Sequence, residues 1–234
     1  MRIVFFMFFV SHFALGQYIG GQEIDSSKLS PWIPKFEIEY SGNYHFGESE
    51  SESDFILFFS KDCIIGQVKM GYWAENAPQW KYKYITLTNI TIGKNGKLTS
   101  DQHSGWFMKY KSDSGKYVKG LKIENPWTGW IEDSEFEFGV KSPLKFEHIY
   151  YGKYTKASIR KLTLQELKDM SPQDLKLMRN EIFARYGFTF KKGGAMEKYF
   201  KKQDWYRSEH INVTKFLTEI ELYNVDLIQK LEIK

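Results

Sequence analysis

Residues 171–187 read SPQDLKLMRNEIFARYG, and this stretch contains the start and stop signals of one helix. Ser171 places a side-chain acceptor at the cap, and Pro172 stands at the first helical position, where a missing amide donor costs nothing. Gly187 supplies the stop, since glycine tolerates the left-handed backbone that ends many helices. The stretch therefore predicts a helix between Ser171 and Gly187.

One face of this helix is apolar and carries an arginine. At about 100° per residue, the apolar face consists of Leu175, Met178, Ile182, Phe183 and Tyr186. Arg179 projects from the middle of that face, where an unpaired guanidinium would be costly. We expect Arg179 to bond Glu221 and Asn224 on a later helix and so to form a structural lock. The alternative is that Arg179 faces a ligand and binds an anion.

Further helix signals lie on both sides of this stretch. Thr163 and Glu166 form a capping box, which predicts a short helix to about Met170. A second Thr-x-x-Glu pattern at 218–221 opens a last helix towards Leu231, and residues 195–202 indicate a shorter helix between them. The sequence thus predicts a helical domain at 157–234.

The region 34–156 shows the alternation typical of half-buried antiparallel strands. Phe36, Ile38 and Tyr40 alternate with glutamates, and Val68 and Met70 follow the same pattern. Turn residues at 94–97, including Asn-Gly, and at 113–115 predict two hairpins. We expect about eight strands in a meander, enough for a small barrel or for two packed sheets. The predicted fold class is therefore α+β, with a β domain at 34–156 followed by helices.

The amino-acid composition excludes some kinds of structure and function. Aromatic residues make up 18% of the 234 residues, so large rings must carry much of the burial. The net charge of +4 is too small and too dispersed for nucleic-acid binding, and no nucleic-acid partner is expected. Cys63 is the only cysteine, which excludes an intramolecular disulfide. We interpret Cys63 as a buried bystander; the alternative is a nucleophile.

The amino terminus resembles an export signal. Arg2 supplies a positive start, residues 3–10 are apolar, and Ala14-Leu15-Gly16 offers small residues for a signal peptidase. Residues 1–16 are therefore predicted to be a cleaved signal peptide, residues 17–33 a lead-in, and the mature chain periplasmic or secreted. A membrane anchor is the alternative, but Ser11 and His12 interrupt the apolar run. No transmembrane segment is expected after cleavage.

The helical segment also resembles a known family. Residues 179–187 read RNEIFARYG, and seven of nine positions match the motif of the YARHG domain, usually RNEIYARHG. The family-motif residues, expected to be structural, are Arg179, Asn180, Glu181, Phe183, Ala184, Arg185, Tyr186 and Gly187. The likeness covers about one third of the chain and implies an extracytoplasmic bacterial module without an established activity. Phe183 and Tyr186 replace the usual tyrosine and histidine. The region from Gly42 onward looks like the β-rich part of Bacteroidetes-type envelope proteins.

Two groups of aromatic and basic residues are candidate binding surfaces. The first group consists of Lys191, Lys192, Tyr199, Lys201, Lys202, Trp205 and Tyr206. This group would suit an anionic glycan, a lipid headgroup or a protein; the alternative is a solvated face around a small aromatic core. The second group is the turn with Trp127 and Trp130, which would stack on a sugar or plug the end of a barrel.

Catalytic and metal-binding signals are weak. The acidic run 48–54 lacks the glycine-turned spacing of a calcium loop, and the histidines lack metal-ligand spacing. No hydrolase or phosphate-loop motif occurs, so we predict no catalytic residue, metal or cofactor. The chain is interpreted as an exported binding protein whose partner is an envelope protein or glycan. The alternatives are a lipocalin-like carrier of a small apolar ligand and a hydrolase of envelope polymers.

Overall fold

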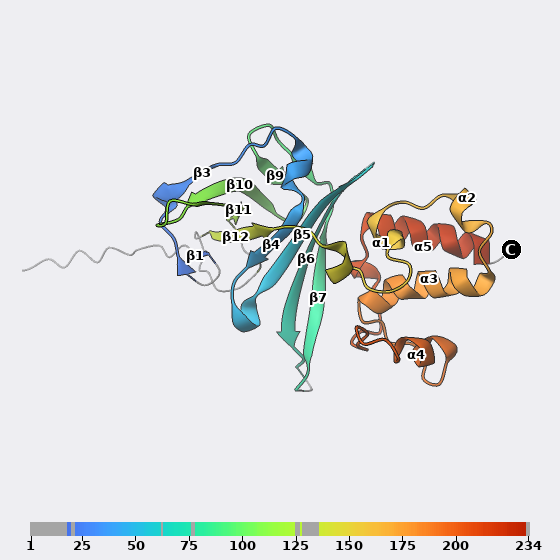
Figure 1. The fold of residues 1–234 in the computed structure, drawn as a ribbon. Helices are drawn as coiled ribbons and strands as arrows, with labels where there is room; N and C mark the ends of the chain where they lie inside the picture. Colours follow the sequence, from blue (N-terminus) through green and yellow to red (C-terminus); the bar gives the residue numbers. More distant parts are fainter. Residues whose placement is uncertain are drawn as a thin grey trace, which may run out of the picture.

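The computed structural model describes residues 18–19, 22–61, 63–75, 78–124, 127 and 136–232. The predicted signal peptide at 1–16 lies outside the described residues, and so does Trp130. The chain forms a β-rich body in its first two thirds and a group of helices in its last third (Figure 1). The predicted α+β class is confirmed.

Within the described residues, twelve strands form one sheet. They are β1 (Tyr18–Ile19), β2 (Gln22–Glu23), β3 (Leu29–Pro31), β4 (Gly42–Phe46), β5 (Ser53–Ser60), β6 (Cys63–Trp73), β7 (Trp80–Leu87), β8 (Thr91–Ile92), β9 (Lys97–Thr99), β10 (Ser104–Lys111), β11 (Tyr117–Ile123) and β12 (Glu137–Ser142). Strands β1 to β3 show that the predicted lead-in also contributes to the sheet.

The sheet curls but does not close. Its strand order is β7-β6-β5-β4-β12-β11-β10-β9-β8, with antiparallel neighbours, and β7 and β8 stand at the two ends. Strands β4 to β7 form one wall and strands β9 to β12 the other (Figure 1). The body is therefore a sandwich of one folded-over sheet, and the closed-barrel interpretation is wrong.

The space between the walls is filled by side chains. The buried residues of this core are Trp32, Tyr40, Tyr44, Phe46, Phe55, Leu57, Val68, Leu87, Leu98, Phe107, Leu121 and Ile123. Tyr40 stacks on Phe107 with ring centroids 4.0 Å apart. Each fully buried ring contributes about 1.5–3 kcal/mol relative to an exposed one. Rings thus occupy the volume that a lipocalin-like carrier would need for its ligand.

Local turn chemistry sets most of the strand ends. Gly96 and Gly115 both have φ of +78°, the left-handed conformation that the two predicted hairpin turns require. The predicted strand at Phe36–Tyr40 is wrong, because Glu37–Tyr40 form a 3₁₀ turn. There the Glu39 side chain accepts a bond from the Phe36 amide at 3.1 Å, and this local bond competes with strand pairing.

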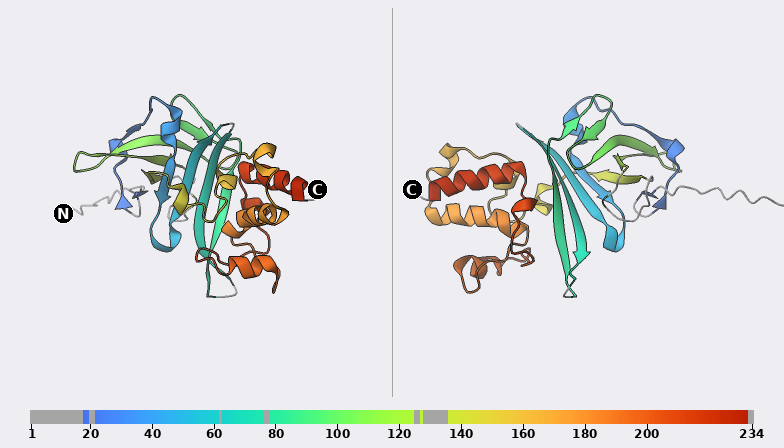
Figure 2. Two further views of the ribbon diagram at one scale, coloured as in Figure 1. Left: turned by 45° about the vertical axis from the view of Figure 1, so that its right-hand side comes forward. Right: turned by 180° about the vertical axis from the view of Figure 1, so that it is seen from behind.

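The helices are α1 (Lys156–Ile159), α2 (Leu164–Leu167), α3 (Pro172–Arg185), α4 (Ala195–Phe200) and α5 (Glu219–Glu232). The predicted capping box of Thr163 and Glu166 is present, although α2 ends before Met170. Ser171 caps α3 by accepting a bond from the Asp174 amide at 3.1 Å. Helices α3 and α5 pack side by side around a core that includes Ile182 and Ile228 (Figure 2).

The helical group covers the outer face of β5 to β7 (Figure 2). Ile56, Phe58 and Ile65 on that face form a buried cluster with Tyr150 and Ile220. Strand β5 is thereby covered on both faces, which explains its nearly continuous apolar run SDFILFFS. The two parts of the chain therefore share a hydrophobic interface.

Candidate functional site

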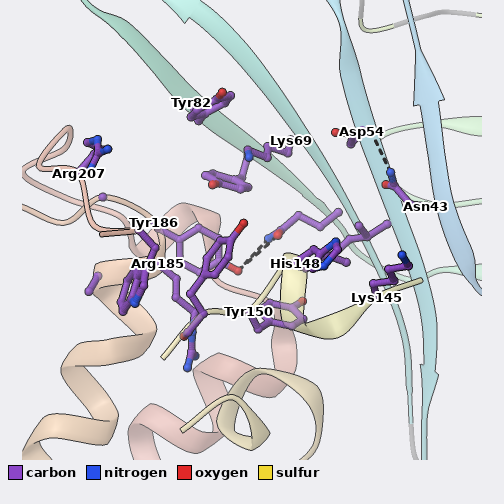
Figure 3. Close-up of a pocket in the computed structure, with 18 of the residues that line it drawn as sticks. Asn43, Asp54, Lys69, Tyr82, Lys145, His148, Tyr150, Arg185, Tyr186 and Arg207 are labelled. Carbon is purple, nitrogen blue, oxygen red and sulfur yellow. Dashed lines mark hydrogen bonds between the residues drawn. The ribbon is translucent and has the colours of Figure 1, made fainter. Parts of the chain in front are cut away.

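A cleft of about 900 Å³ lies between the outer face of the sheet and the helical group (Figure 3). Strands β4 to β7 provide one wall, with residues such as Asn43, Asp54 and Lys69. Residues 142–151 and 184–209 provide the rest, including Tyr150 and Arg207. The cleft exists only because the two parts dock, so neither part contains it alone.

Lys69 forms no ion pair with any described residue. Its cross-strand neighbour is Asp54, but the Asp54 carboxylate is engaged by His45 Nδ1 and Asn43 Nδ2, both at 3.0 Å. Lys69 Nζ lies 4.1 Å from the centre of the Tyr82 ring, and within the described residues no hydrogen bond or ion pair engages it. The side chain is exposed to water. Desolvation by the neighbouring protein nevertheless lowers the pKa of Lys69 below its ordinary value.

Other side chains of the cleft have donors that bond to no described residue. The Tyr150 side chain is buried, with 3% exposed, and its hydroxyl has no hydrogen-bond partner in the described part of the chain. Arg207 uses only Nη1, which donates to the carbonyls of Asp204 and Tyr206 at 3.0 and 2.9 Å. Lys145 is exposed and forms no ion pair with any described residue. An unpartnered buried hydroxyl costs about 1–3 kcal/mol, so Tyr150 is a place where a ligand or water would bind favourably.

Two carboxylates of the cleft accept hydrogen bonds from protein donors. Burial raises the pKa of Asp54, but the bonds from His45 and Asn43 outweigh burial, and the pKa lies below its ordinary value. Glu209 Oε2 accepts a bond from the Tyr82 amide at 2.9 Å, which covers the edge of strand β7. The remaining carboxylate that lines the cleft, Asp204, is exposed. The cleft therefore also contains acceptors without a bond to a described residue: Asn43 Oδ1, Asp54 Oδ2 and Glu209 Oε1.

Aromatic rings lie along the cleft. Tyr82 and Tyr84 come from β7, and Tyr151 and Trp205 come from the helical side. Trp205 and Tyr151 are stacked, with centroids 6.1 Å apart and planes 16° apart, and 43% of Tyr151 is exposed. Exposed flat rings beside hydrogen-bond donors are suited to the faces of sugar rings.

A buried hydrogen-bond network joins the helices, and Arg185, not Arg179, belongs to it. Arg185 donates to Glu181 at 2.5 Å and to the Ser158 hydroxyl at 2.7 Å, and its side chain is 3% exposed. The Ser158 hydroxyl donates to the fully buried Glu221 at 2.5 Å. Tyr186 also donates to Glu221, at 2.6 Å. Arg185 is therefore the arginine at the centre of the buried network.

The prediction that Arg179 bonds Glu221 and Asn224 is wrong. Arg179 forms a two-pronged ion pair with Glu232 at 2.8 and 2.9 Å, near the end of α5. Asn224 instead accepts from the Leu162 amide at 2.8 Å and donates to the carbonyls of Ala157 and Arg160. Arg179 thus joins α3 to the last residue of α5, whereas the predicted partner Glu221 lies near the start of α5.

The network also reaches the sheet. Gln67 Nε2 on β6 lies 3.2 Å from the Tyr186 hydroxyl and donates to the Phe216 carbonyl at 2.7 Å. Thr86 on β7 donates to the same carbonyl at 2.8 Å. Residue 186, where the family motif usually has histidine, thus contacts the sheet in this chain.

Comparison with known proteins agrees with this geometry. Residues 151–233 match the model of the YARHG domain. The helical third of the chain is a YARHG domain. The motif residues Glu181, Arg185 and Tyr186 belong to the buried network of this domain and hold its elements together. The match begins at residue 151, ahead of the predicted boundary at 157.

One curated relative shares part of the chain. The 6-phospho-beta-galactosidase of Clostridium acetobutylicum is 34% identical over 92 residues, which cover 38% of this chain. The chain spans only 19% of the length of that relative. No solved structure matches the chain. The likeness to Bacteroidetes-type envelope proteins stays a prediction.

The three rings of the first predicted group, Tyr199, Trp205 and Tyr206, pack in one aromatic cluster, as the alternative of a small aromatic core requires. Lys191, Lys192, Lys201 and Lys202 are exposed, whereas Tyr206 is 6% exposed and donates to the Phe188 carbonyl at 2.7 Å. Tyr199 packs partly buried against the same aromatic cluster as Tyr206. Only Trp205 of the whole predicted group lines the cleft.

Trp127 lies elsewhere, on the core of the sandwich. Its ring centroid lies 5.0 Å from Phe46 and 5.6 Å from Phe55. Trp127 thus packs against rings of the sandwich core, and the stacking role predicted for this turn stays a prediction. Cys63 is half-buried beside the apolar cluster at the domain interface.

Two features are absent from the described residues. No group of three or more histidine, cysteine, aspartate or glutamate side chains is arranged to hold a metal ion. None of the described helices combines the length and the apolar character that a membrane span needs. The acidic run 48–54 forms a short 3₁₀ turn at Ser49–Ser51 and the start of β5.

Proposed function

We propose that this protein is an exported cell-envelope binding protein without catalytic activity, and that its ligand is a glycan held in the cleft between sheet and YARHG domain. The observation that carries the proposal is the cleft of about 900 Å³, whose rings and unpartnered donors come from both domains. YARHG domains are typical of extracytoplasmic proteins, which supports an envelope location.

The chemistry of the cleft favours binding over hydrolysis. Glycoside hydrolysis needs a carboxylic acid with a raised pKa beside a second carboxylate. In the described cleft, Asp54 has a lowered pKa and Glu209 is bonded to a backbone amide. Burial raises the pKa of Glu221, but that side chain is fully buried in the motif network. The filled interior of the sandwich equally speaks against an apolar carrier.

A binding assay tests the proposal. The mature chain is titrated by calorimetry with peptidoglycan fragments, chitotriose, galactose and galactose 6-phosphate. The last two are included because the partial relative is named as a 6-phospho-beta-galactosidase. We expect saturable binding that Trp205→Ala weakens about tenfold, in line with the loss of one aromatic contact worth 1–2 kcal/mol.

A matched variant separates the cleft from the rest of the surface. Tyr117 is an exposed ring on β11, outside the cleft, so Tyr117→Ala is expected to leave binding unchanged. Absence of binding to every saccharide, or equal losses in both variants, would refute the proposed site. Release of product from any of these saccharides would refute the non-catalytic role.

A further inference from the structure

The cleft presents cationic and hydroxyl donors that the protein itself leaves without acceptors. We infer that the glycan carries an anionic group, a carboxylate or a phosphate, and that Lys69 is the residue that binds this group. This inference rests on the proposed function, because it concerns the ligand of the same cleft. It goes further by naming the chemical class of that ligand.

The first step is the isolation of Lys69. A lysine beside an aspartate on the neighbouring strand normally pairs with it, but Asp54 accepts from His45 and Asn43 at Oδ1 and forms no ion pair with Lys69. Lys69 is left facing the cleft with only the Tyr82 ring at 4.1 Å. A ligand anion would supply the charge-assisted bond that the protein does not make.

The second step is the position of Tyr150. A buried tyrosine hydroxyl usually finds a partner, yet this hydroxyl has none among the described residues while Tyr150 lines the cleft. Its ring is already fixed by Phe58, with centroids 6.4 Å apart. The hydroxyl is therefore a rigid donor whose expected acceptor comes from outside the protein.

Further cations line the cleft near Lys69. Lys145 and Arg207 add two further cations to the lining, both on the helical side or its connection to the sheet. Of the three lining carboxylates, Asp54 accepts bonds from Asn43 and His45 at Oδ1, and Glu209 accepts the Tyr82 amide at Oε2. None of the three forms an ion pair with these lining cations. The hydroxyls of a neutral sugar would contact the rings, but only a ligand anion would place a charged acceptor directly beside Lys69 Nζ.

The test compares acidic saccharides with their neutral counterparts. Trigalacturonic acid and its methyl ester share the same rings and differ in charge, and galactose 6-phosphate and galactose form a second pair. We expect at least one acidic probe to bind about tenfold or more tightly than its neutral counterpart, the size of one charged hydrogen bond. The pair that shows the difference tells whether the anion is a carboxylate or a phosphate.

Two lysines of one hairpin provide matched variants. Lys69→Met removes the cation in the cleft, whereas Lys83→Met removes a lysine from β7 whose side chain lies near the Tyr72 ring, on the other face. Lys69→Met should abolish the preference for the acidic probe and leave binding of the neutral probe unchanged. Lys83→Met should keep the preference.

A third variant separates binding from folding. Tyr150→Phe removes a hydroxyl that bonds to no described residue, so its melting temperature should be unchanged or higher. Its affinity for the acidic probe should nevertheless fall severalfold. A lower melting temperature with unchanged affinity would contradict the role given to this hydroxyl.

The outcomes distinguish this inference from the proposed function. Equal affinity for acidic and neutral probes, or equal effects of Lys69→Met and Lys83→Met, would overturn the anionic ligand while saccharide binding in the cleft stands. If none of the saccharides binds, the proposed function fails and this inference fails with it.

Discussion

Gly152 has a backbone that side chains rarely adopt. Its φ is +105°, and a Cβ added there would lie 2.3 Å from the carboxyl carbon of Glu181. That carboxylate accepts the amides of Lys153 and Tyr154 at 2.9 and 2.6 Å. Gly152→Ala is therefore expected to lower the free energy of unfolding by about 2–4 kcal/mol, measured by urea denaturation.

Gly193 provides the control for that substitution. It also has a positive φ, +76°, but no atom lies within 4 Å of an added Cβ. Gly193→Ala should therefore cost only the backbone strain, about 1 kcal/mol. If both substitutions lower the free energy of unfolding equally, the contact with Glu181 does not destabilise the Gly152→Ala variant.

Glu221 makes stability depend on pH in an unusual direction. Burial raises its pKa above the ordinary value of 4.5, although bonds from Ser158, Tyr186 and the Thr218 amide limit the rise. The folded state thus holds the proton more strongly than the unfolded state. The contribution of Glu221 to stability therefore falls as pH rises from about 4.5 through the folded pKa.

The measurement compares the wild type with Glu221→Gln. The free energy of unfolding of each is determined by denaturation at a series of pH values. The wild-type value minus the variant value should decrease with rising pH across that window, because only the wild type titrates at this position. A difference that increases with pH would contradict the raised pKa.

At the scale of elements, α3 carries two arginines with unequal roles. Arg185 is 3% exposed and bonds Glu181, Ser158 and the Tyr151 carbonyl, whereas Arg179 is 18% exposed and bonds Glu232. Arg185→Ala leaves the buried Glu181 without its cation and should cost about 3–5 kcal/mol. Arg179→Ala should cost about 1 kcal/mol. The melting curves of the two variants check this order, and a larger loss for Arg179→Ala would reverse it.

The helix starts could be predicted because their signals are local. Thr163 with Glu166, Ser171 with Asp174, and Thr218 with Glu221 each bond across three residues. The choice between Arg179 and Arg185 could not be predicted in this way. Both lie on α3, and only the packing of Ser158 and α5 against α3 shows which of them reaches Glu221.

The cleft was harder to predict from sequence than the helices. Trp205 was predicted because it stands beside other rings and lysines in a short segment. Lys69 and Tyr150 carried no local signal, since they are far apart in the chain and meet only when the YARHG domain covers the sheet. The register that places Asp54 opposite Lys69 is likewise a property of the paired strands.

At the scale of the whole molecule, sheet and YARHG domain dock through both apolar and polar contacts. The shared cluster of Ile56, Phe58 and Ile65 with Ile220 supplies the apolar part. Gln67 and Thr86 supply the polar part by donating to the Phe216 carbonyl at 2.7 and 2.8 Å. A third contact closes the edge of β7, where Glu209 accepts the Tyr82 amide.

These contacts are expected to open together. The double variant Gln67→Ala, Thr86→Val removes both donors to Phe216 and should lower the free energy of unfolding by about 2–3 kcal/mol. Because docking is one cooperative event, the Tyr82 amide should also exchange its hydrogen faster, although neither substitution touches its bond to Glu209. Hydrogen exchange followed by mass spectrometry measures this rate.

Thr91→Val is the control, because Thr91 bonds only Thr99, at 2.7 Å, within the sheet away from the YARHG domain. It should leave the Tyr82 amide as protected as in the wild type. If the double variant also leaves that protection unchanged, the contacts at Phe216 and Glu209 open independently.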